Sequence, residues 1–458
     1  MNMILNTDSY KVSHFAQYPE GTTNVFSYIE SRGGEYDHTL FFGLQAFIKE
    51  YLLKPITYED IAEAKEVYAL HGVPFNEAGW KHILLQHNGF LPIKIKAVRE
   101  GTIVPTHNVL VTVENTDPEV PWLTSYVETA LLRAVWYPTT VATISHSIRQ
   151  IIKERLDTSA NNLDGLDFKL HDFGARGVSS LESAAIGGAA HLVNFKGTDN
   201  VPALMFARKY YNEHMAGFSI PAAEHSTITS WGKEHEEDAY ANMLKQFAKP
   251  GALVAVVSDS YDLFNAIENI WGGTLRQQVI DSGATLVVRP DSGNPTDIVA
   301  HSVVLLDKKF GHTLTKDGYK LLNNVRVIQG DGINEQSIKD ILARLWMMGY
   351  SADNVAFGMG GALLQHMNRD TQKFAMKASA VKVNGVWRDV FKDPVTDFGK
   401  KSKKGRLELY YNHINNTYHT DIEGSDHVHN PVLEVVYEDG KLVREESLSL
   451  IRERVKAQ

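Results

Sequence analysis

Residues 285–295 read TLVVRPDSGNP, a short apolar run that ends in a turn with one arginine and one aspartate. Residues 296–309 follow with apolar side chains at the spacing of a helix. A buried strand, a polar loop and a helix in this order are typical of parallel sheets joined by crossover helices. The stretch therefore predicts one strand–loop–helix unit of an α/β fold.

The same order recurs through the middle of the chain. Four further apolar runs end in small and polar residues: 168–170 before HDFG, 253–257 before SDSYD, 325–328 before QGDG and 354–357 before GMGG. Helical spacing returns at 261–271 and 334–348. Catalytic groups collect on such loops in (β/α) barrels and in open doubly wound sheets alike. The pattern predicts one shared functional face and leaves barrel and open sheet as alternatives.

The two ends of the chain follow another pattern. We expect helices at 41–53, 58–71, 121–136, 140–156 and 447–455, and strands within 91–113, after 380 and at 431–437. A chain of 458 residues is too long for a single core. The expected segments are therefore 1–160, a catalytic segment 161–380 and a final segment 381–458.

Composition excludes several classes of function. The chain has 46 basic and 55 acidic side chains, and its net charge of −9 argues against general nucleic-acid binding. It has no cysteine, which rules out a thiol nucleophile, disulfides and cysteine zinc sites. We expect no signal peptide and no membrane span, since the required basic and apolar runs are missing. These features predict a cytoplasmic enzyme.

His225 is a candidate catalytic residue, with Glu224 beside it and the acidic loop at Asp259 and Asp262 elsewhere in the chain. A carboxylate bound to one imidazole nitrogen fixes the tautomer and makes the other nitrogen more nucleophilic. A purely structural histidine is the alternative. The sequence leaves the two interpretations about equal.

Arg289 and Asp291 stand on either side of Pro290 in a turn. Arginine binds phosphates and polarised carbonyls, while aspartate can accept ribose hydroxyls or hold hydrated Mg²⁺. A salt bridge that only shapes the turn is the alternative. Their place after a strand favours function.

Glycines at 330, 332, 358, 360 and 361 offer bare backbone N–H groups to a phosphate. The chain lacks a complete dinucleotide fingerprint and a GxxxxGK[ST] loop, which argues against dehydrogenases and P-loop ATPases. Phe173 and Tyr10 could stack on a flat heteroaromatic ligand, although packing under a loop explains them as well. Residues alone thus indicate an α/β enzyme that handles phosphosugars.

Nine segments taken in order resemble the nicotinamide phosphoribosyltransferase family closely. They are TDSYK at 7–11, HDFGARG at 171–177, NFKGTD at 194–199, AEHST at 223–227, SDSYD at 258–262, RPDSGNP at 289–295, QGDG at 329–332, FKDP at 391–394 and KKGRL at 403–407. The resemblance implies the type II phosphoribosyltransferase fold, an irregular (β/α) barrel with a mixed α/β domain formed from both chain ends, residues 1–160 and 381–458. It also implies a homodimer with active sites at the subunit interface.

The resemblance implies transfer of a phosphoribosyl group from 5-phosphoribosyl 1-pyrophosphate to nicotinamide in NAD salvage. The products would be nicotinamide mononucleotide and pyrophosphate, with Mg²⁺ as cofactor and ATP as co-substrate. ATP would phosphorylate His225, with Asp259 orienting the ring, and Asp259 and Asp291 would hold Mg²⁺, through water where they do not bind it directly.

The remaining roles are also carried over from the family. Phe173 and Tyr10 of the partner subunit would sandwich nicotinamide, Asp199 would accept its carboxamide N–H, and Ser219 would lie beside it. Arg176 and Arg289 would line the base and phosphate region; Asp291, Gly330 and Asp331 would hold the ribose; Gly360 and Gly361 would hold its phosphate. Contacts to the phosphates of phosphoribosyl pyrophosphate or ATP would come from Arg32, Arg369, Lys377, Lys392 and Lys400.

The chain departs from animal members of the family at peripheral positions. The stretch between Arg32 and Phe41 is short, and Phe168 and Ala175 replace tyrosines. This pattern is similar to bacterial or phage members and affects regulation more than the reaction. Two alternatives remain: a nicotinate phosphoribosyltransferase, which a carboxylate at Asp199 disfavours by repulsion, and a catalytically silent binding protein of the same fold.

Overall fold

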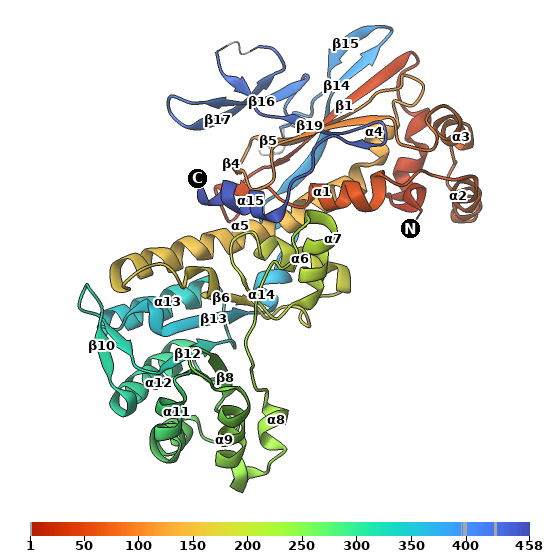
Figure 1. Cartoon of the computed structure of the whole chain (residues 1–458). Helices are drawn as coiled ribbons and strands as arrows, with labels where there is room; N and C mark the ends of the chain where they lie inside the picture. Colours follow the sequence, from red (N-terminus) through yellow and green to blue (C-terminus); the bar gives the residue numbers. More distant parts are fainter. Residues whose placement is uncertain (1, 395, 397–400, 426–427) are drawn as a thin grey trace. The chain divides into compact units, whose positions relative to one another are not determined.

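The computed structural model describes residues 2–394, 396, 401–425 and 428–458, and the chain divides into two compact units (Figure 1). Unit 1 comprises Met1–Thr143, Ala207–Glu213 and Met367–Gln458, and unit 2 comprises Ile144–Phe206 and His214–His366. The expected boundaries at 160 and 380 differ from these. Helix α5 (Glu128–Ser159) continues from one unit into the other, and β14 (Phe374–Val383) belongs whole to the sheet of unit 1.

The main sheet of unit 1 takes strands from both ends of the chain. Its order is β15 (Val386–Asp389), β14, β1 (Thr22–Ser31), β5 (Val109–Asn115), β3 (Ile93–Ala97), β19 (Glu434–Glu438) and β20 (Lys441–Leu442), all paired antiparallel. Tyr28 of β1 lies opposite Lys377 of β14. Residues more than 340 positions apart thus build one mixed α/β unit.

Helices and smaller sheets complete unit 1. The helical elements are η1 (Met3–Leu5), η2 (Ser9–Ala16), α1 (Leu44–Phe47), η3 (Ile48–Leu52), α2 (Tyr58–His71), α3 (Glu77–Gln86), α4 (Leu123–Tyr126), η8 (Arg369–Thr371) and α15 (Leu448–Lys456), with α7 (Val201–Tyr211) shared with unit 2. The small sheets pair β2 (His38–Leu40) with β4 (Ile103–Pro105), and β16 (Leu407–Asn412) with β17 (Thr417–Ile422) and β18 (Asn430–Pro431). Helix α2 spans the predicted 58–71, with a capping box at Thr57 and Asp60.

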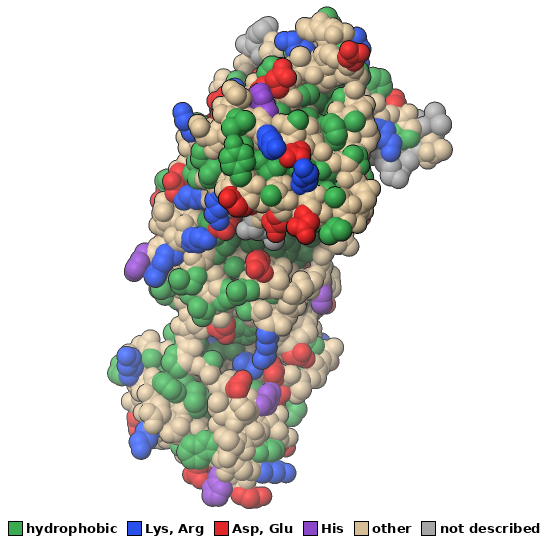
Figure 2. All heavy atoms as spheres, turned by 90° about the vertical axis from the view of Figure 1, so that its right-hand side faces the viewer, with side chains coloured by type: hydrophobic (Ala, Val, Ile, Leu, Met, Phe, Trp, Pro, Cys, Tyr) green, Lys and Arg blue, Asp and Glu red, His purple; other side chains and the backbone are tan. Residues whose placement is uncertain are grey.

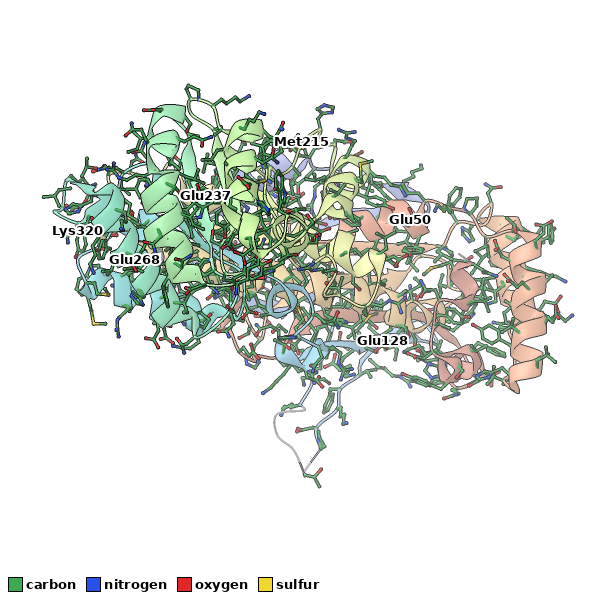
Figure 3. All side chains as sticks on the ribbon, turned by 90° about the horizontal axis from the view of Figure 1, so that it is seen from below. Glu50, Glu128, Met215, Glu237, Glu268 and Lys320 are labelled. Atoms are coloured by element: carbon green, nitrogen blue, oxygen red, sulfur yellow. The ribbon has the colours of Figure 1, made fainter. Side chains whose placement is uncertain are left out.

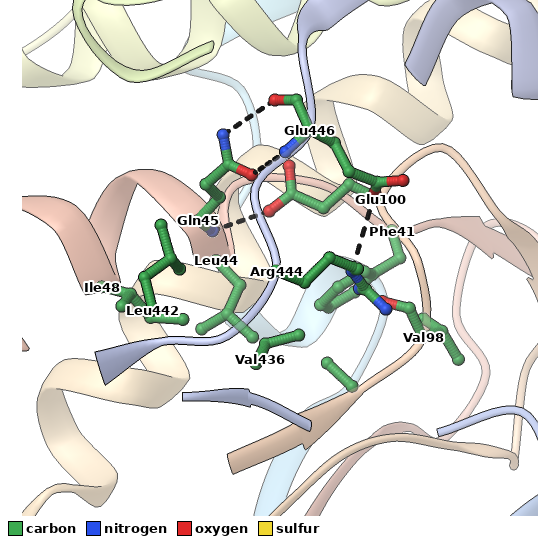
Figure 4. Close-up of a pocket in the computed structure, with 11 residues that line it drawn as sticks. Phe41, Leu44, Gln45, Ile48, Val98, Glu100, Val436, Leu442, Arg444 and Glu446 are labelled. Atoms are coloured by element: carbon green, nitrogen blue, oxygen red, sulfur yellow. Dashed lines mark hydrogen bonds and ion pairs between the residues drawn. The ribbon is translucent and has the colours of Figure 1, made fainter. Parts of the chain in front are cut away.

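Figure 4 shows a buried polar network in unit 1 that links the two chain ends. The Gln45 side-chain amide donates to the Glu446 carbonyl at 2.9 Å and accepts the Glu446 backbone N–H at 2.8 Å. Glu100 accepts the Gln45 backbone N–H at 2.7 Å, and burial raises the pKa of its carboxyl group. The cavity beside these residues holds about 10 Å³, room for about one water molecule. It is too small to bind a substrate.

Unit 2 is built on a curled parallel sheet. Its order is β7 (Gly197–Thr198), β6 (Leu170–Asp172), β13 (Val355–Met359), β12 (Val325–Gln329), β9 (Thr285–Arg289) and β8 (Leu253–Val257). Residues 218–223 bond to both edge strands: Thr198 donates its N–H to the Phe218 carbonyl, and Ala223 donates to the Ala255 carbonyl, each at 3.0 Å. This segment joins the edges, so the fold is the predicted irregular barrel and not an open sheet.

Crossover helices surround this sheet in Figure 1. The elements are η4 (Leu166–Phe168), α6 (Leu181–His191), α8 (His225–Thr229), η5 (Lys233–His235), α9 (Glu236–Phe247), α10 (Leu263–Asn265), η6 (Ala266–Thr274), α11 (Arg276–Ser282), α12 (Pro295–Phe310), α13 (Glu335–Met347), η7 (Ala352–Asn354) and α14 (Gly361–Leu364), with a hairpin of β10 (His312–Leu314) and β11 (Lys320–Leu322). The strand expected at 168–170 begins at Leu170 instead. The Phe168 N–H bonds to the Gly165 carbonyl in a turn and is not available for strand pairing.

Two separate helices were expected at 121–136 and 140–156. In the structure, a short helix, α4, begins this region, and the single helix α5 covers the rest of both expected ranges from Glu128 onward. Pro138 lies inside α5, where its ring packs against Gly43. Among the described residues, no helix has the combination of length and apolar character that a membrane crossing needs.

Candidate functional site

A predicted site residue follows the carboxyl end of each of six strands in unit 2. The pairs of strand and residue are β6 and Phe173, β7 and Asp199, β8 and Asp259, β9 and Asp291, β12 and Gly330, and β13 and Gly360. Parallel strands place these loops on one face of the barrel. Ser219 lies in the segment that joins the barrel edges, and His225 begins α8 just beyond it.

Asp259 joins His225 to the loop after β9. Its Oδ1 lies 3.0 Å from Nε2 of His225, and its Oδ2 accepts the Asp291 backbone N–H at 2.9 Å and the Ser292 hydroxyl at 2.6 Å. The Asp259 side chain is 5% exposed, whereas the His225 side chain is 44% exposed. The carboxylate is therefore held inside while one face of the imidazole is open to a ligand.

The same contacts keep Asp259 ionised. Burial raises the pKa of its carboxyl group, but the hydrogen bonds from Ser292, His225 and the Asp291 amide outweigh burial and lower the pKa below its ordinary value. A permanently charged carboxylate stabilises an imidazole that gains positive charge. The second ring nitrogen, Nδ1 of His225, lies 3.8 Å from Oδ2 of Asp291.

Arg289 brings a guanidinium group to this loop. Its Nη2 lies 3.5 Å from Oδ2 of Asp291, and its Nη1 donates to the Ala223 carbonyl at 3.4 Å. Its Nε is buried without a hydrogen-bond partner among the described residues. Since both contacts are long and one donor is unused, the guanidinium keeps the capacity to bind an anion.

The Phe173 ring is half-buried and rests on glycines. A Cβ atom at Gly358 would lie 2.0 Å from the ring, and one at Gly330 would lie 3.4 Å from it. Phe173 also packs against a small apolar cluster of Ala255, Val287 and Ile328 inside the barrel. The ring can approach the barrel mouth only because these two positions lack side chains.

Asp199 and Ser219 face one another. The Ser219 hydroxyl donates to Oδ1 of Asp199 at 2.5 Å, and both residues are exposed. The Asp199 backbone N–H bonds to the Asp172 carbonyl at 3.0 Å, next to Phe173. This backbone bond places the exposed Asp199 opposite the residue that precedes the half-buried Phe173.

Gly360 and Gly361 lie where β13 meets α14, and the loop after Phe173 packs over them. A Cβ at Gly360 would approach the Phe173 carbonyl at 3.6 Å, and one at Gly177 would approach the Gly361 N–H at 3.5 Å. Arg176 is exposed on this loop, and Asp331 is exposed after β12. These residues are neighbours along one rim of the barrel.

The remaining predicted residues belong to unit 1. Tyr10, in η2, is 61% exposed, and its ring meets His14 edge-on. Arg369 and Lys392 are exposed, while Lys400 lies outside the described residues. Arg32 donates through Nε to Glu30 at 3.0 Å, and its Nη2 is buried without a partner among the described residues.

Lys377 lies within a group of cations in unit 1. Burial lowers the pKa of its ammonium group, Glu128 opposes the shift, and the charges of Arg32, Lys11 and Arg369 lower the pKa further. Lys11 bonds to Glu128 at 2.6 Å, where α5 begins (Figure 3). Lys403 bonds to Glu30 as well. Lys11, Arg32, Lys403 and Arg369 each have a carboxylate partner, whereas Lys377 has none among the ion pairs of the described residues. A group of cations of this kind can bind phosphate.

Comparison with known proteins identifies the family. The sequence model of the nicotinate phosphoribosyltransferase (NAPRTase) family matches residues 168–440, and that of the nicotinamide phosphoribosyltransferase N-terminal domain matches residues 2–95. A nicotinamide phosphoribosyltransferase of Xanthomonas campestris pv. campestris (strain 8004) is 58% identical over 456 residues, which cover 98% of this chain and 97% of that one. The chain belongs to the nicotinamide phosphoribosyltransferase family. A family member from Acinetobacter baylyi is 33% identical, covering 100% and 98% of the two chains.

Solved structures share the fold of this phosphoribosyltransferase family member. A nicotinate-nucleotide pyrophosphorylase from Pyrococcus furiosus aligns with a TM-score of 0.63 at 17% identity, covering 100% of this chain and 95% of that one. Human nicotinic acid phosphoribosyltransferase aligns with a TM-score of 0.58 at 15% identity, covering 98% and 93%. At these identities the likeness establishes the barrel and mixed-domain architecture.

Several residues beside the site were not singled out from the sequence of this family member. Asp172 is fully buried and accepts the Gly174 N–H at 2.7 Å and the Asn200 side-chain amide at 2.8 Å. Burial raises its pKa to about 6. Ser292 holds Asp259, and Glu30 holds two cations. Asp172 and Ser292 lie inside the family segments and Glu30 lies two positions before Arg32, so position close to a predicted residue was the available signal.

The carboxylates predicted to hold Mg²⁺ suit an indirect contact. Both oxygens of Asp259 already accept hydrogen bonds, and Asp291 directs Oδ2 toward Arg289 and His225. These two residues do not belong to a set of three close metal ligands among the described residues. Hydrated Mg²⁺ carried by substrate phosphates fits them better than a cation bound by the protein alone.

Proposed function

We propose that this chain transfers the phosphoribosyl group of 5-phosphoribosyl 1-pyrophosphate to nicotinamide, with ATP hydrolysis coupled to the reaction through His225. The observation that carries the proposal is the placement of Asp259, which bonds to His225 with one oxygen and to the Arg289–Asp291 loop with the other. The family relationship supplies the substrate class. The residue that ATP would phosphorylate is thereby connected to residues that would bind the ribose.

Nicotinamide would stack on Phe173, with its carboxamide toward Asp199. The carboxylate accepts an amide N–H, and the Ser219 hydroxyl that now donates to Asp199 can turn toward the carboxamide oxygen. A nicotinate carboxylate would be repelled by Asp199. This contact is the basis for preferring nicotinamide over nicotinate. Tyr10 of the partner subunit would cover the second face of the ring in a homodimer.

In the transfer step, the pyridine nitrogen bonds to C1 of the ribose as the bond from C1 to pyrophosphate breaks. Positive charge grows on the ribose ring and negative charge on the leaving group. Asp291 and Asp331 would stabilise the positive charge and bind ribose hydroxyls. Arg289, which lies 3.5 Å from Asp291, and Arg176 would stabilise the negative charge. Gly330 would help to hold the ribose, and Gly360 and Gly361 would give its phosphate access to the backbone. Mg²⁺, when bound, neutralises pyrophosphate charge.

In the ATP-dependent step, the open nitrogen of His225 attacks the γ-phosphorus and ADP leaves. Asp259 stabilises the imidazole as it gains positive charge, and water later releases the phosphate. Phosphorylation adds negative charge beside Asp291 and Arg289, which shifts the position of the loop that holds the ribose. Arg32, Arg369, Lys377, Lys392 and Lys400 would bind the phosphates of the two substrates. A cytoplasmic location stays a prediction of the sequence.

The test is product formation from phosphoribosyl pyrophosphate and Mg²⁺ with nicotinamide or nicotinate, each with and without ATP. We expect a strong preference for nicotinamide and an increase with ATP that His225→Ala removes. His235→Ala is the matched control, because His235 also bonds to an aspartate at 2.8 Å, and that aspartate is Asp238 and not Asp259.

The other outcomes separate the alternatives. Preference for nicotinate would overturn the role of Asp199 and keep the fold and the histidine step. No turnover with either base, in a protein that binds both substrates, would favour the silent binding protein.

A further inference from the structure

We infer that His82, His87 and Asp117 form a site for a divalent transition metal such as Zn²⁺ in unit 1, with water as the remaining ligand. Nε2 of His82 and Nε2 of His87 each lie 2.7 Å from Oδ2 of Asp117. Their ligand atoms all lie within 4.8 Å of one another, and no other such trio occurs among the described residues. Two imidazoles and one carboxylate are common ligands of Zn²⁺.

The two imidazoles come from the end of α3. His82 lies within the helix, and His87 follows its last residue, Gln86, with its N–H bonded to the Ile83 carbonyl at 3.0 Å. Their ring centroids are 6.0 Å apart. The carbonyl end of a helix favours a cation. In Figure 1, α3 lies next to α2 in unit 1.

Asp117 is held in place independently of the histidines. Its Oδ1 accepts the Glu119 N–H at 2.9 Å, and its carbonyl accepts the Asn115 side-chain amide at 2.7 Å. Asn115 is buried and also bonds to Thr23 and Val25 of β1. The carboxylate therefore presents Oδ2 to the imidazoles from a rigid support, as a metal ligand requires.

The charge at the trio also favours a cation. No lysine or arginine pairs with Asp117 among the described residues, so only the two imidazoles face its Oδ2. On the face drawn in Figure 2, charged side chains of both signs are interspersed. The three side chains are 31%, 26% and 13% exposed, which allows a hydrated ion to enter.

Metal binding needs only small changes. In the metal-free form, both imidazoles carry Nε2 protons that share one carboxylate oxygen. On binding, each neutral ring keeps its proton on Nδ1 and offers Nε2 as a lone-pair donor, with metal–nitrogen bonds of about 2.0–2.1 Å. The ion would connect the end of α3 to the loop after β5 and stabilise unit 1.

The experiment titrates the full chain, freed of metal with a chelator, with Co²⁺ in excess Mg²⁺ and follows visible absorption. We expect one Co²⁺ per chain, displaced by Zn²⁺. His82→Gln and His87→Gln should each weaken binding at least about tenfold. His312→Gln should not, although His312 also bonds to one aspartate, Asp307, at 2.6 Å, and is 30% exposed.

A second measurement covers variants that fold poorly. Zn²⁺ should raise the melting temperature of the wild type and of His312→Gln, and should not raise that of Asp117→Asn, which keeps the shape of the side chain. Absence of stoichiometric Co²⁺ binding to the wild type would overturn the inference. Equal binding by wild type, His82→Gln and His87→Gln would overturn it as well, because the ion would then lie elsewhere.

Discussion

Nε2 of His225 lies 3.0 Å from Oδ1 of Asp259, and this one contact connects α8 with the loops after β8 and β9. The other oxygen of Asp259 is taken by the Asp291 amide and the Ser292 hydroxyl. A single buried carboxylate thus sets both the orientation of the imidazole and the position of the loop. A change on one side is therefore expected to act on the other through these hydrogen bonds.

Asp259→Asn should remove most of the ATP-dependent increase in product formation, with a loss of about tenfold or more. The amide keeps the shape but cannot stabilise an imidazole that gains positive charge. Turnover without ATP should fall less. Ser292→Ala is the control, since it removes one bond to Oδ2 and leaves the contact with His225. An unchanged increase in Asp259→Asn would contradict the role of this pair.

Asp199→Asn should raise the ratio of nicotinate to nicotinamide turnover by about tenfold, because the repulsive charge is removed. Competition between the two bases in one reaction measures the ratio directly. Ser219→Ala removes the 2.5 Å hydrogen bond and keeps the charge, so its ratio should stay close to that of the wild type. The assignment of Asp199 fails if its substitution leaves the ratio unaltered.

Gly358→Ala should raise the KM for nicotinamide by about tenfold or more, since the new methyl group would lie 2.0 Å from the Phe173 ring and displace it. The KM for phosphoribosyl pyrophosphate should change less. Gly273→Ala is the control, because its nearest contact would be 3.6 Å away. Equal KM values in the two variants would show that Phe173 does not position the base.

The stability of the protein should depend on Asp172 between about pH 4 and pH 7. Its pKa rises from 3.8 to about 6 on folding, so the folded state binds the proton more tightly than the unfolded state. Protonation of Asp172 therefore contributes about 2–3 kcal/mol to the free energy of unfolding. This contribution is fully present below pH 3.8 and is lost as pH rises through 6.

Denaturant unfolding at several pH values measures this dependence. The difference in unfolding free energy between wild type and Asp172→Asn should change over the stated window, with the wild type losing stability as pH rises. Asp164→Asn removes an exposed carboxylate and serves as control. Parallel pH curves for wild type and Asp172→Asn would refute the prediction.

The sequence by itself determined the parallel strands of unit 2 and the residues on their loops. Runs such as 253–257 and 285–288 are apolar, and each ends in residues that cannot continue a buried strand. Local composition suffices there, because burial and turn chemistry are properties of adjacent residues. Helix α2 was likewise predictable from its spacing and cap.

Other elements needed the folded chain. Helix α6 contains Gly187 and Gly188, which weaken a helical pattern, yet a Cβ at Gly188 would lie 2.4 Å from the Asn200 amide. The small residues of α6 allow Asn200 to pack close to the helix backbone, and no pattern in the neighbouring sequence indicates this contact. Strand β1, in the middle of the unit 1 sheet, was also not predicted, and its partner β14 stands more than 340 residues away.

Only the tertiary structure decided that the sheet closes, since residues 218–223 bond to both edges without a strand pattern of their own. It also decided which residues meet: Asp259 with His225, Ser219 with Asp199, and His82 with His87 and Asp117. The hydrogen bonds among these residues join positions 20 to 35 apart. These residues meet only after the strands of the barrel or sheet have assembled. The physical reason is that each contact depends on the positions of whole strands and not on the properties of adjacent residues.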